Sequence, residues 1–158
     1  MTPDINPTAV FIPEGGDRFS TERGMGITSL RYKVVQEETN GRLFVIEQTM
    51  HAKGGPPRHL HLEQEEWFYS IRGHFILEIG EEQYTLTEGD SVLAPRAVPH
   101  VWAFVGDSPG RILIAFTPAG KMKEFFDETV KSNGMPGQDP AFWEAHGMEL
   151  LGPPLRVE

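Results

Sequence analysis

The residues of this chain with the clearest potential for chemistry are three histidines and one glutamate. His59 and His61 flank a single leucine, and Glu66 follows five residues later. His100 comes from a distant part of the chain. Imidazole and carboxylate groups bind divalent transition metals, and a metal with only four protein ligands usually keeps a position or two open for water or substrate. The sequence therefore predicts a metal centre at which a small molecule could react.

Alternation along β-strands explains how neighbouring residues could supply these ligands. Residues i and i+2 of a strand point to the same face, so His59 and His61 project side by side. Glu66 would face the other way if that strand continued, but residues 62–65 read as a loop and a new strand at Glu66 can face inward again. Glu65 is the alternative ligand, and the alternation of the following residues favours Glu66.

The same alternation predicts the walls of a cavity around the metal. Phe68 and Ser70 would face inward from the strand of the glutamate, whereas Trp102 and Phe104 would face inward from the strand of the last histidine. One carboxylate and three neutral imidazoles leave a divalent ion with a net positive charge that suits an anionic oxygen. A largely apolar pocket with a few converging polar groups is the usual form of a small-molecule site. We expect a small substrate that is apolar or planar.

An outward-facing apolar stripe is expected on the strand that carries the glutamate. Trp67, Tyr69 and Ile71 alternate with the inward residues of this strand. An exposed patch of this kind promotes association. The N-terminal arm, a helix or a twofold mate could cover it, and we favour the twofold mate, so the chain is expected to form a homodimer.

The length and composition are those of one globular domain. A chain of 158 residues can bury about two thirds of its unfolded surface and fold without disulfides. The 17 glycines and 13 prolines suit many short strands joined by turns. Because there are no cysteines, any metal ligands must come from His, Asp or Glu.

The net charge of −9 argues against a nucleic-acid partner, because phosphate backbones repel an acidic surface. No apolar run approaches the roughly 20 residues of a membrane-spanning helix. The first residues carry neither the basic nor the apolar region of a signal peptide. We therefore expect a cytoplasmic protein whose partner is a small-molecule substrate.

Short apolar stretches separated by turn residues run from residue 31 to residue 116. Their spacing of about 8–12 residues, without an intervening helical pattern, is typical of an antiparallel sandwich or barrel. We predict an all-β fold with a barrel over residues 30–117, preceded by an arm over residues 1–29 whose apolar stretch, 9–12, could form a strand. The candidate strands are 43–50, 67–71, 75–79, 83–86, 91–94, 101–105 and 111–116.

Two short helices are predicted after the barrel, within residues 118–147. Thr117 has the features of an N-cap and Pro118 those of a first helical residue. The apolar residues that would share one face of this helix are Met122, Phe125, Phe126 and Val130. A second helix is expected to start at residues 139–140, and the stiff apolar tail over 148–158 should dock on the body of the single domain.

The order and spacing of these residues resemble the two signature motifs of the cupin superfamily. In this chain the motifs read His59-x-His61-x4-Glu66-x6-Gly73 and Gly89-x5-Pro95-x4-His100. Residues 66–73 are especially similar to the bacterial single-domain cupins that are often labelled quercetin 2,3-dioxygenase-like. Residues 118–126 and 147–154 also resemble that group, so the resemblance covers nearly the whole chain.

The resemblance implies a double-stranded β-helix (jelly-roll-like) barrel that is often a homodimer. It implies one divalent transition metal, either Fe, Ni, Mn, Co, Cu or Zn, held by His59, His61, Glu66 and His100. In flavonol-cleaving relatives the motif glutamate also serves as base toward the substrate hydroxyl, a catalytic role that would fall on Glu66. Two positions depart from the second motif: Ala97 replaces a common glycine, and Phe104 replaces a common asparagine and so removes a polar group from the predicted cavity.

Other residues near the motifs have simpler interpretations. His51, His74 and His146 are expected away from the metal, at or near the surface. Arg58 and Arg96 could attract an anionic substrate, but arginines in such positions more often pair with surface carboxylates.

Three functions from different classes remain open. The first, which we favour, is a metal-dependent dioxygenase of the quercetinase type in which Glu66 handles the proton. The second is a non-redox lyase, isomerase or cyclase in which the ion acts as a Lewis acid. The third is a binding protein without turnover. The scarcity of other acid or base groups near the metal favours oxygen chemistry, although one fold can host all three.

Overall fold

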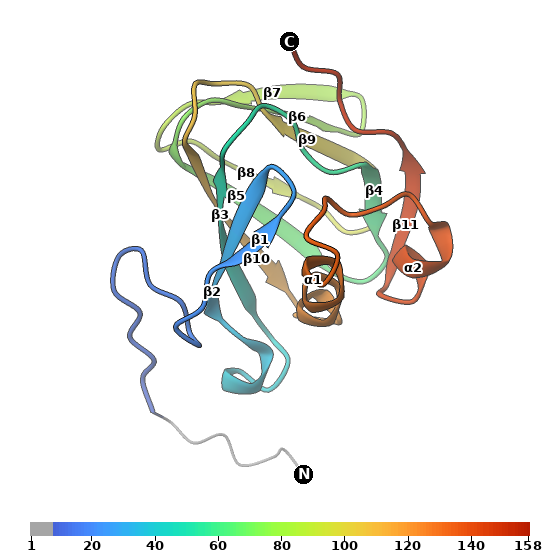
Figure 1. Cartoon of the computed structure of the whole chain (residues 1–158). Coiled ribbons are helices and arrows are strands. Elements are labelled where there is room, and N and C mark those ends of the chain that lie inside the picture. The colour runs from blue at the N-terminus through green and yellow to red at the C-terminus, as the bar shows by residue number, and fades with distance from the viewer. Residues whose placement is uncertain (1–7) are drawn as a thin grey trace.

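The computed structural model describes residues 8–158, so the first seven residues of the predicted arm lie outside the described part of the chain. Two antiparallel sheets pack against each other, and two helices lie together on one side (Figure 1). The six-stranded sheet has the order β1-β2-β3-β10-β5-β8, and the five-stranded sheet has the order β11-β4-β9-β6-β7. The strands are β1 (Arg23–Met25), β2 (Thr28–Val34), β3 (Phe44–Met50), β4 (Arg58–His61), β5 (Glu65–Arg72), β6 (Phe75–Ile79), β7 (Glu82–Leu86), β8 (Ser91–Ala94), β9 (His100–Phe104), β10 (Gly110–Thr117) and β11 (Met148–Gly152).

The predicted alternation is clear on β5. Glu66, Phe68 and Ser70 are buried between the sheets, whereas Trp67 and Tyr69 are only half-buried on the outer face. An antiparallel sheet with one solvated face needs strands whose residues are alternately buried and exposed, and β5 has this pattern. The interpretation of inward and outward faces is therefore confirmed for this strand.

Aromatic side chains fill much of the space between the sheets. The ring of Phe44 packs edge-on against Tyr32 at 5.2 Å and stacks on Phe116 at 5.9 Å between ring centroids. At the far end of the barrel, the ring of Phe75 packs on Phe104 at 5.2 Å. Rings in such tilted and edge-on pairs gain electrostatic stabilisation beyond the apolar area that they bury.

The all-β fold is confirmed, and most of the predicted strands agree with the structure. The segments 75–79 and 91–94 match β6 and β8, and the other candidates differ by one or two residues at their ends. The predicted barrel boundary at residue 30 lies inside β2, because the turn after β1 already pairs these two strands within the segment expected to be an arm. The apolar stretch 9–12 forms no strand.

The C-terminal tail contains a strand that the sequence did not predict. Within β11, Met148 pairs with His61 of β4 and Leu150 pairs with His59. The register breaks before Gly152, and the Gly-Pro-Pro sequence that follows obscured a strand this short. The tail thus supports the strand that carries two of the predicted metal ligands.

The first helix begins later than predicted. Helix α1 is Met122–Val130 and follows Lys121, whereas Thr117 is the last residue of β10 and pairs with Glu65 of β5. This pairing keeps Thr117 in the sheet, so it does not cap the helix. The second helix, α2 (Pro140–Glu144), starts as predicted, with the carboxylate of Asp139 accepting a hydrogen bond from the Ala141 amide at 3.2 Å. A short 3-10 helix spans Gln36–Glu38, and none of the helices in residues 8–158 is long and apolar enough to cross a membrane.

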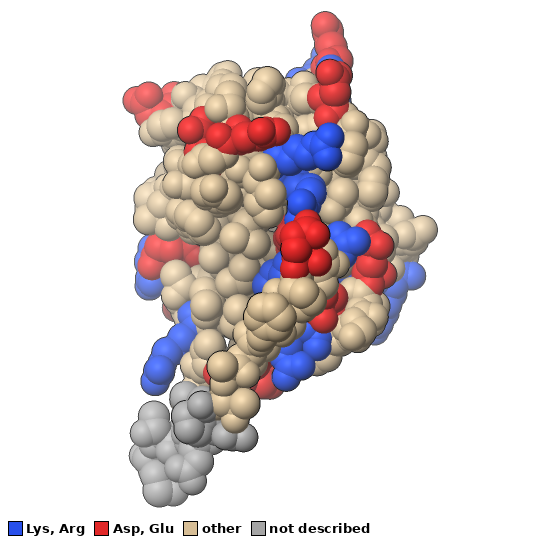
Figure 2. Space-filling view, turned by 90° about the vertical axis from the view of Figure 1, so that its left-hand side faces the viewer, with Lys and Arg blue, Asp and Glu red and all other residues tan. Residues whose placement is uncertain are grey.

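The arm lies against the outer face of the six-stranded sheet. Glu14 pairs with Arg111 of β10 at 3.0 Å, and Arg111 also pairs with Glu47 of β3 at 2.8 Å. Figure 2 shows acidic and basic side chains gathered beside the arm. On the same outer face the rings of Trp67 and Tyr69 stack at 5.7 Å, and their pairing with a twofold mate stays a prediction.

Candidate metal centre

Two neighbouring strands bring the three histidines together. His59 of β4 lies directly opposite His100 of β9 in the register, and His61 lies two residues along on the same face. The ring centroids of His59 and His100 are 4.5 Å apart, and those of His61 and His100 are 5.5 Å apart. All three side chains are buried. The pairing of β4 with β9 therefore brings His100 next to His59 and His61, although His100 is distant from them in the sequence.

The glutamate reaches this cluster from the opposite sheet. Glu66 starts the inward face of β5, and its Oε1 lies 2.8 Å from His61 Nε2 and 3.0 Å from His100 Nε2. One ligand atom from each of the four residues lies within 4.8 Å of the others. Ligands bound to one transition metal at about 2.0–2.2 Å lie roughly 3–4 Å apart, so only small shifts would centre the four atoms on an ion.

Each histidine is oriented through its other ring nitrogen. His59 Nδ1 donates to the carbonyl of Pro57 at 2.7 Å, and His61 Nδ1 donates to Gln64 Oε1 at 2.5 Å. Gln64 must present its oxygen here, because its amide nitrogen donates to the carbonyl of Pro118 at 2.8 Å. A histidine whose Nδ1 carries the proton offers the lone pair of Nε2 to a metal.

The contact between His61 and Glu66 tests whether a metal fits. With Nδ1 already donating, His61 Nε2 and Glu66 Oε1 are two acceptors that face each other, so a cation has to occupy the contact, either a proton on the ring or a metal ion. Three imidazoles and one carboxylate suit first-row divalent metals. The set contains no thiolate, the ligand that favours Cu(I) or an iron–sulfur cluster. The four residues therefore fit one ion of the predicted type.

The electrostatics favour the ligand forms of these groups. Burial lowers the pKa of His59 to about 3, and the nearby His100 and His61 lower it further, so this ring is neutral at pH 7. Burial alone would raise the pKa of Glu66, but hydrogen bonds with His100 and His61 outweigh it and hold the pKa below its ordinary value. A neutral imidazole and an ionised carboxylate are the states that bind metal.

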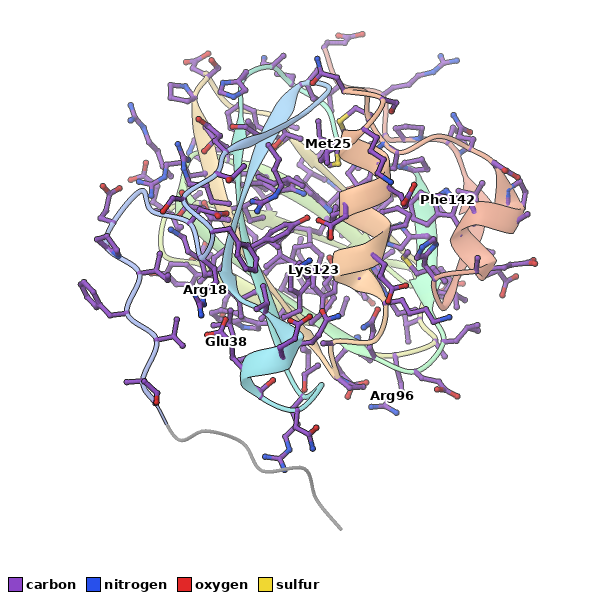
Figure 3. All side chains as sticks on the ribbon, turned by 60° about the horizontal axis from the view of Figure 1, so that its bottom comes forward. Arg18, Met25, Glu38, Arg96, Lys123 and Phe142 are labelled. Atoms are coloured by element: carbon purple, nitrogen blue, oxygen red, sulfur yellow. The ribbon has the colours of Figure 1, made fainter. Side chains whose placement is uncertain are left out.

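A small cavity of about 30 Å³ adjoins the cluster, with room for about two water molecules. His59, His61 and Glu66 line it, and its other walls are mostly apolar. Those walls come largely from outside the central strands and include Met25, Met122, Phe125, Phe126, Trp143 and Met148. In Figure 3, Met25 of β1 lies beside α1, and Phe142 projects from α2.

Of the four residues predicted to form the substrate pocket, only Trp102 lines this cavity. Phe68, Ser70 and Phe104 are buried as predicted but do not line it. The hydroxyl of Ser70 donates to the Gly73 carbonyl at 2.7 Å, at the far turn of β5. The inward face of a strand runs the whole length of the barrel, whereas the cavity occupies only the metal end.

Several residues at the site were not predicted from the sequence. Gln64 belongs to an acidic run that was expected to be a solvated loop, and Phe125 was expected only to pack its helix. The indole of Trp143 lies 4.9 Å from the His59 ring between centroids. Gln48 also lines the cavity, and the alternation of β3, which places Phe44, Gln48 and Met50 on one face, could have revealed it.

The secondary candidates lie where expected. His51 and His74 are exposed, and His146 is partly exposed on the turn after α2. Arg96 pairs with Glu65 at 2.9 Å, and Arg58 pairs with Glu78 at 2.9 Å. Both arginines form ion pairs with carboxylates, and Glu65 lies on the outer face of β5 while Glu66 lies on the inner face.

The comparisons with known proteins agree with this architecture. The model of the cupin domain family matches residues 46–116. These residues resemble a cupin domain, and the described chain has the cupin fold. No curated protein matches the chain. Among solved structures, KdgF from a Halomonas species has a TM-score of 0.60 at 17% identity and covers 70% of this chain and 94% of its own.

Two further cupin-fold neighbours are more distant. An RmlC-like cupin from Shewanella frigidimarina has a TM-score of 0.54 at 22% identity, over 65% of this chain and 87% of its own. Pac13, described as a nucleoside dehydratase, has a TM-score of 0.51 at 10% identity, over 62% of this chain and 75% of its own. At such identities the likeness shows the fold.

The cupin turn before β9 contains a non-glycine residue with left-handed backbone. Ala97 has a φ of 63°, and its amide donates to the carbonyl of His61 at 2.7 Å. An alanine in this region is strained, whereas glycine adopts it freely. We expect Ala97→Gly to raise the free energy of unfolding by about 0.5–1 kcal/mol, measured by urea denaturation. A loss of stability would mean that the alanine methyl group contributes packing that outweighs the strain.

Gln64→Met is expected to weaken metal binding by about 10–100-fold without removing a ligand. The substitution keeps the size of the side chain but removes the acceptor that orients His61. Isothermal titration of the metal-free protein with Zn²⁺ or Co²⁺ measures the change. An unchanged affinity would show that Gln64 does not orient the histidine.

Acid is expected to destabilise the metal-free protein. The unfolded chain takes up a proton on His59 near its ordinary pKa of 6.5, whereas the folded chain resists it down to about 3. Folding stability is therefore lost as the pH falls from about 6.5 toward 3, at no more than about 1.4 kcal/mol per pH unit for this group. Glu66 adds to the loss below its ordinary 4.5. Urea midpoints measured in EDTA would contradict this if they stayed constant from pH 7 to pH 5.

Proposed function

We propose that this chain is a metal-dependent, dioxygenase-like cupin of the quercetinase type that acts on a small, apolar or aromatic, oxygen-bearing compound. One observation carries the proposal: three of the four clustered ligands line a cavity whose remaining walls are nearly all hydrocarbon or aromatic. A reaction that needed several acid and base groups would find few here. Glu66 is the one carboxylate that lines the cavity among the described residues.

The residues of the chain would do three things. His59, His61, Glu66 and His100 would hold the ion, which supplies Lewis acidity and, if redox-active, electrons for oxygen chemistry. The apolar walls would exclude water and orient a flat substrate. Glu66, kept ionised by its histidine neighbours, would accept the proton of a substrate hydroxyl at its carboxylate.

The size of the cavity restricts the substrate. A pocket for a drug-sized ligand encloses about 300–1,000 Å³, far more than the cavity of about 30 Å³ beside the cluster. Any aromatic compound would enter only if the side chains of α1 and of the segment around Met135 moved outward, and a flavonol would need the largest movement. We therefore propose that the substrate is smaller than a flavonol.

The test is oxygen uptake by metal-reconstituted protein. Metal-free protein is loaded separately with Fe, Mn, Ni, Co, Cu and Zn, and is then mixed with a panel of diketones, small hydroxy-ketones and flavonols. We expect substrate-dependent oxygen uptake with a redox-active metal, fastest with the small compounds. Glu66→Gln should abolish it, with metal content measured in parallel.

Two other outcomes would replace this proposal. Turnover with Zn²⁺ in the absence of oxygen would identify a lyase, isomerase or cyclase, a class to which the fold neighbour Pac13 belongs as a dehydratase. A filled metal site without turnover on any of the compounds would favour a binding protein.

A further inference from the structure

Gln48 is a buried polar residue whose side-chain amide makes no hydrogen bond within residues 8–158. It is 4% exposed. Each of the others has a side-chain partner in the fold: Thr28, Ser29, Glu47, His59, His61, Gln64, Glu66, Ser70, His100 and Thr129. Buried amides are nearly always hydrogen-bonded. The fully enclosed side-chain atoms without a partner in residues 8–158 are Gln36 Oε1 and Glu38 Oε2, so the amide of Gln48 still reaches open space, which is the cavity that it lines.

Its place in the fold directs Gln48 toward the site. On β3 it lies between Leu30 of β2 and Ile112 of β10, both apolar, on the inward face of the sheet. It lines the same cavity as His59 and Glu66. The amide is therefore held in the cavity by strands on both sides.

A second buried glutamine shows what a structural role looks like. Gln64 is 6% exposed, and both ends of its amide are used, by His61 and by the carbonyls of Pro118 and Ala119. Gln48 has the same chemistry and similar burial with none of these contacts. An amide that faces so small and apolar a cavity without a protein partner destabilises the folded protein, and no hydrogen bond of Gln48 to the fold offsets this.

The indole of Trp102 adds a second polar group without a partner. Trp102 is 2% exposed and lines the cavity, and its N–H donates to no group within residues 8–158. An indole N–H is only a donor, whereas an amide both donates and accepts. Together they suit an oxygen that accepts hydrogen bonds.

We propose that Gln48, assisted by Trp102, binds a second oxygen of the substrate, apart from the oxygen that meets the metal centre. The cavity lining contains no Lys or Arg within the described chain, so this second group is neutral, a carbonyl or a hydroxyl, and not a carboxylate. The substrate is then a compact apolar compound with two oxygen functions. This inference rests on the proposed function in one respect: it assumes that the compound that binds in the cavity is the substrate.

Melting of the metal-free protein tests the inference without a ligand. Gln48→Met keeps the size of the side chain and removes the unpaired amide, so we expect the melting temperature to rise by about 2–4 °C. The matched control, Gln64→Met, should lower it, because it breaks three hydrogen bonds. A melting temperature that is unchanged or lower in Gln48→Met would overturn the inference.

Ligand binding provides a second measurement. Zn²⁺-loaded protein is titrated with 4-hydroxybenzaldehyde and with 4-methylphenol, which lacks the second oxygen, and with the corresponding 3-substituted pair. We expect the wild type to prefer the aldehyde of one pair by about tenfold, the worth of one hydrogen bond, and Gln48→Met to lose this preference while binding the methylphenol as before.

The outcomes separate this inference from the proposed function. An aldehyde preference that persists in Gln48→Met would overturn the role of Gln48 even if oxygen uptake is observed. A preference that depends on Gln48 in a protein without oxygen uptake would retain the inference and reject the dioxygenase. If neither probe binds, the melting comparison decides.

Discussion

Replacement of His100 by alanine is expected to reduce the metal content of the purified protein from about one ion per chain to nearly none. His100 is the ligand that β9 contributes, and its Nε2 lies 3.0 Å from Glu66 Oε1 inside the buried cluster. Without this ring the site keeps three ligands and loses the fourth, so we expect the affinity for Zn²⁺ or Co²⁺ to fall by more than about 100-fold. Elemental analysis and isothermal titration measure the two quantities.

Two further histidine variants serve as controls, one inside the cluster and one outside it. His61→Ala should reproduce the loss, because His61 meets the same carboxylate oxygen. His74→Ala should leave the metal content unchanged, because His74 is exposed on the turn between β5 and β6. An equal loss in all three variants would show that the inward and outward faces have been assigned the wrong way round.

Trp143→Ala is expected to lower the free energy of unfolding by about 3–5 kcal/mol. Trp143 is 1% exposed, and its ring packs against Phe125 at 4.9 Å and His59 at 4.9 Å between centroids. The indole also donates to the Gly137 carbonyl at 2.8 Å. Its removal leaves a void beside a predicted metal ligand, so urea denaturation should show the loss and the variant should admit larger ligands.

Two variants calibrate this result. Trp143→Phe keeps most of the ring and removes the hydrogen bond, so it should cost only about 0.5–1.5 kcal/mol. Phe11→Ala should have almost no effect, because Phe11 is 84% exposed. If Trp143→Ala were no more harmful than Phe11→Ala, the contact between α2 and the barrel would not contribute to stability.

Much of the barrel could be predicted from the sequence because the responsible signals are local. Alternation with period two places His59 beside His61 and Glu66 on the face of Phe68, whatever the rest of the chain does. Turn glycines such as Gly73 separate one strand from the next. These signals act over a few residues, so most of the barrel strands, the inward face of β5 and the four candidate ligands were visible before any tertiary contact was known.

The environment of the candidate ligands depends on contacts between distant segments. The sequence showed that Ser70 and Phe104 face inward but not that the metal end of the barrel lies elsewhere along their strands. Nor did it show that Gln64 turns its amide oxygen toward His61, since that orientation depends on the bond from the Gln64 amide nitrogen to the Pro118 carbonyl, in the turn after β10. The apolar residues of α1 were read as packing, and only the assembled fold shows that Phe125 also closes the cavity.

The sequence by itself determined which residues could bind a metal and which strand faces are buried, because strand periodicity and ligand chemistry are properties of neighbouring residues. Only the tertiary structure decided where the cavity lies, what encloses it and which amide faces it without a protein partner. Those properties depend on the packing of α1, α2 and β11 against the barrel, and side-chain packing across such distances in sequence has no local pattern.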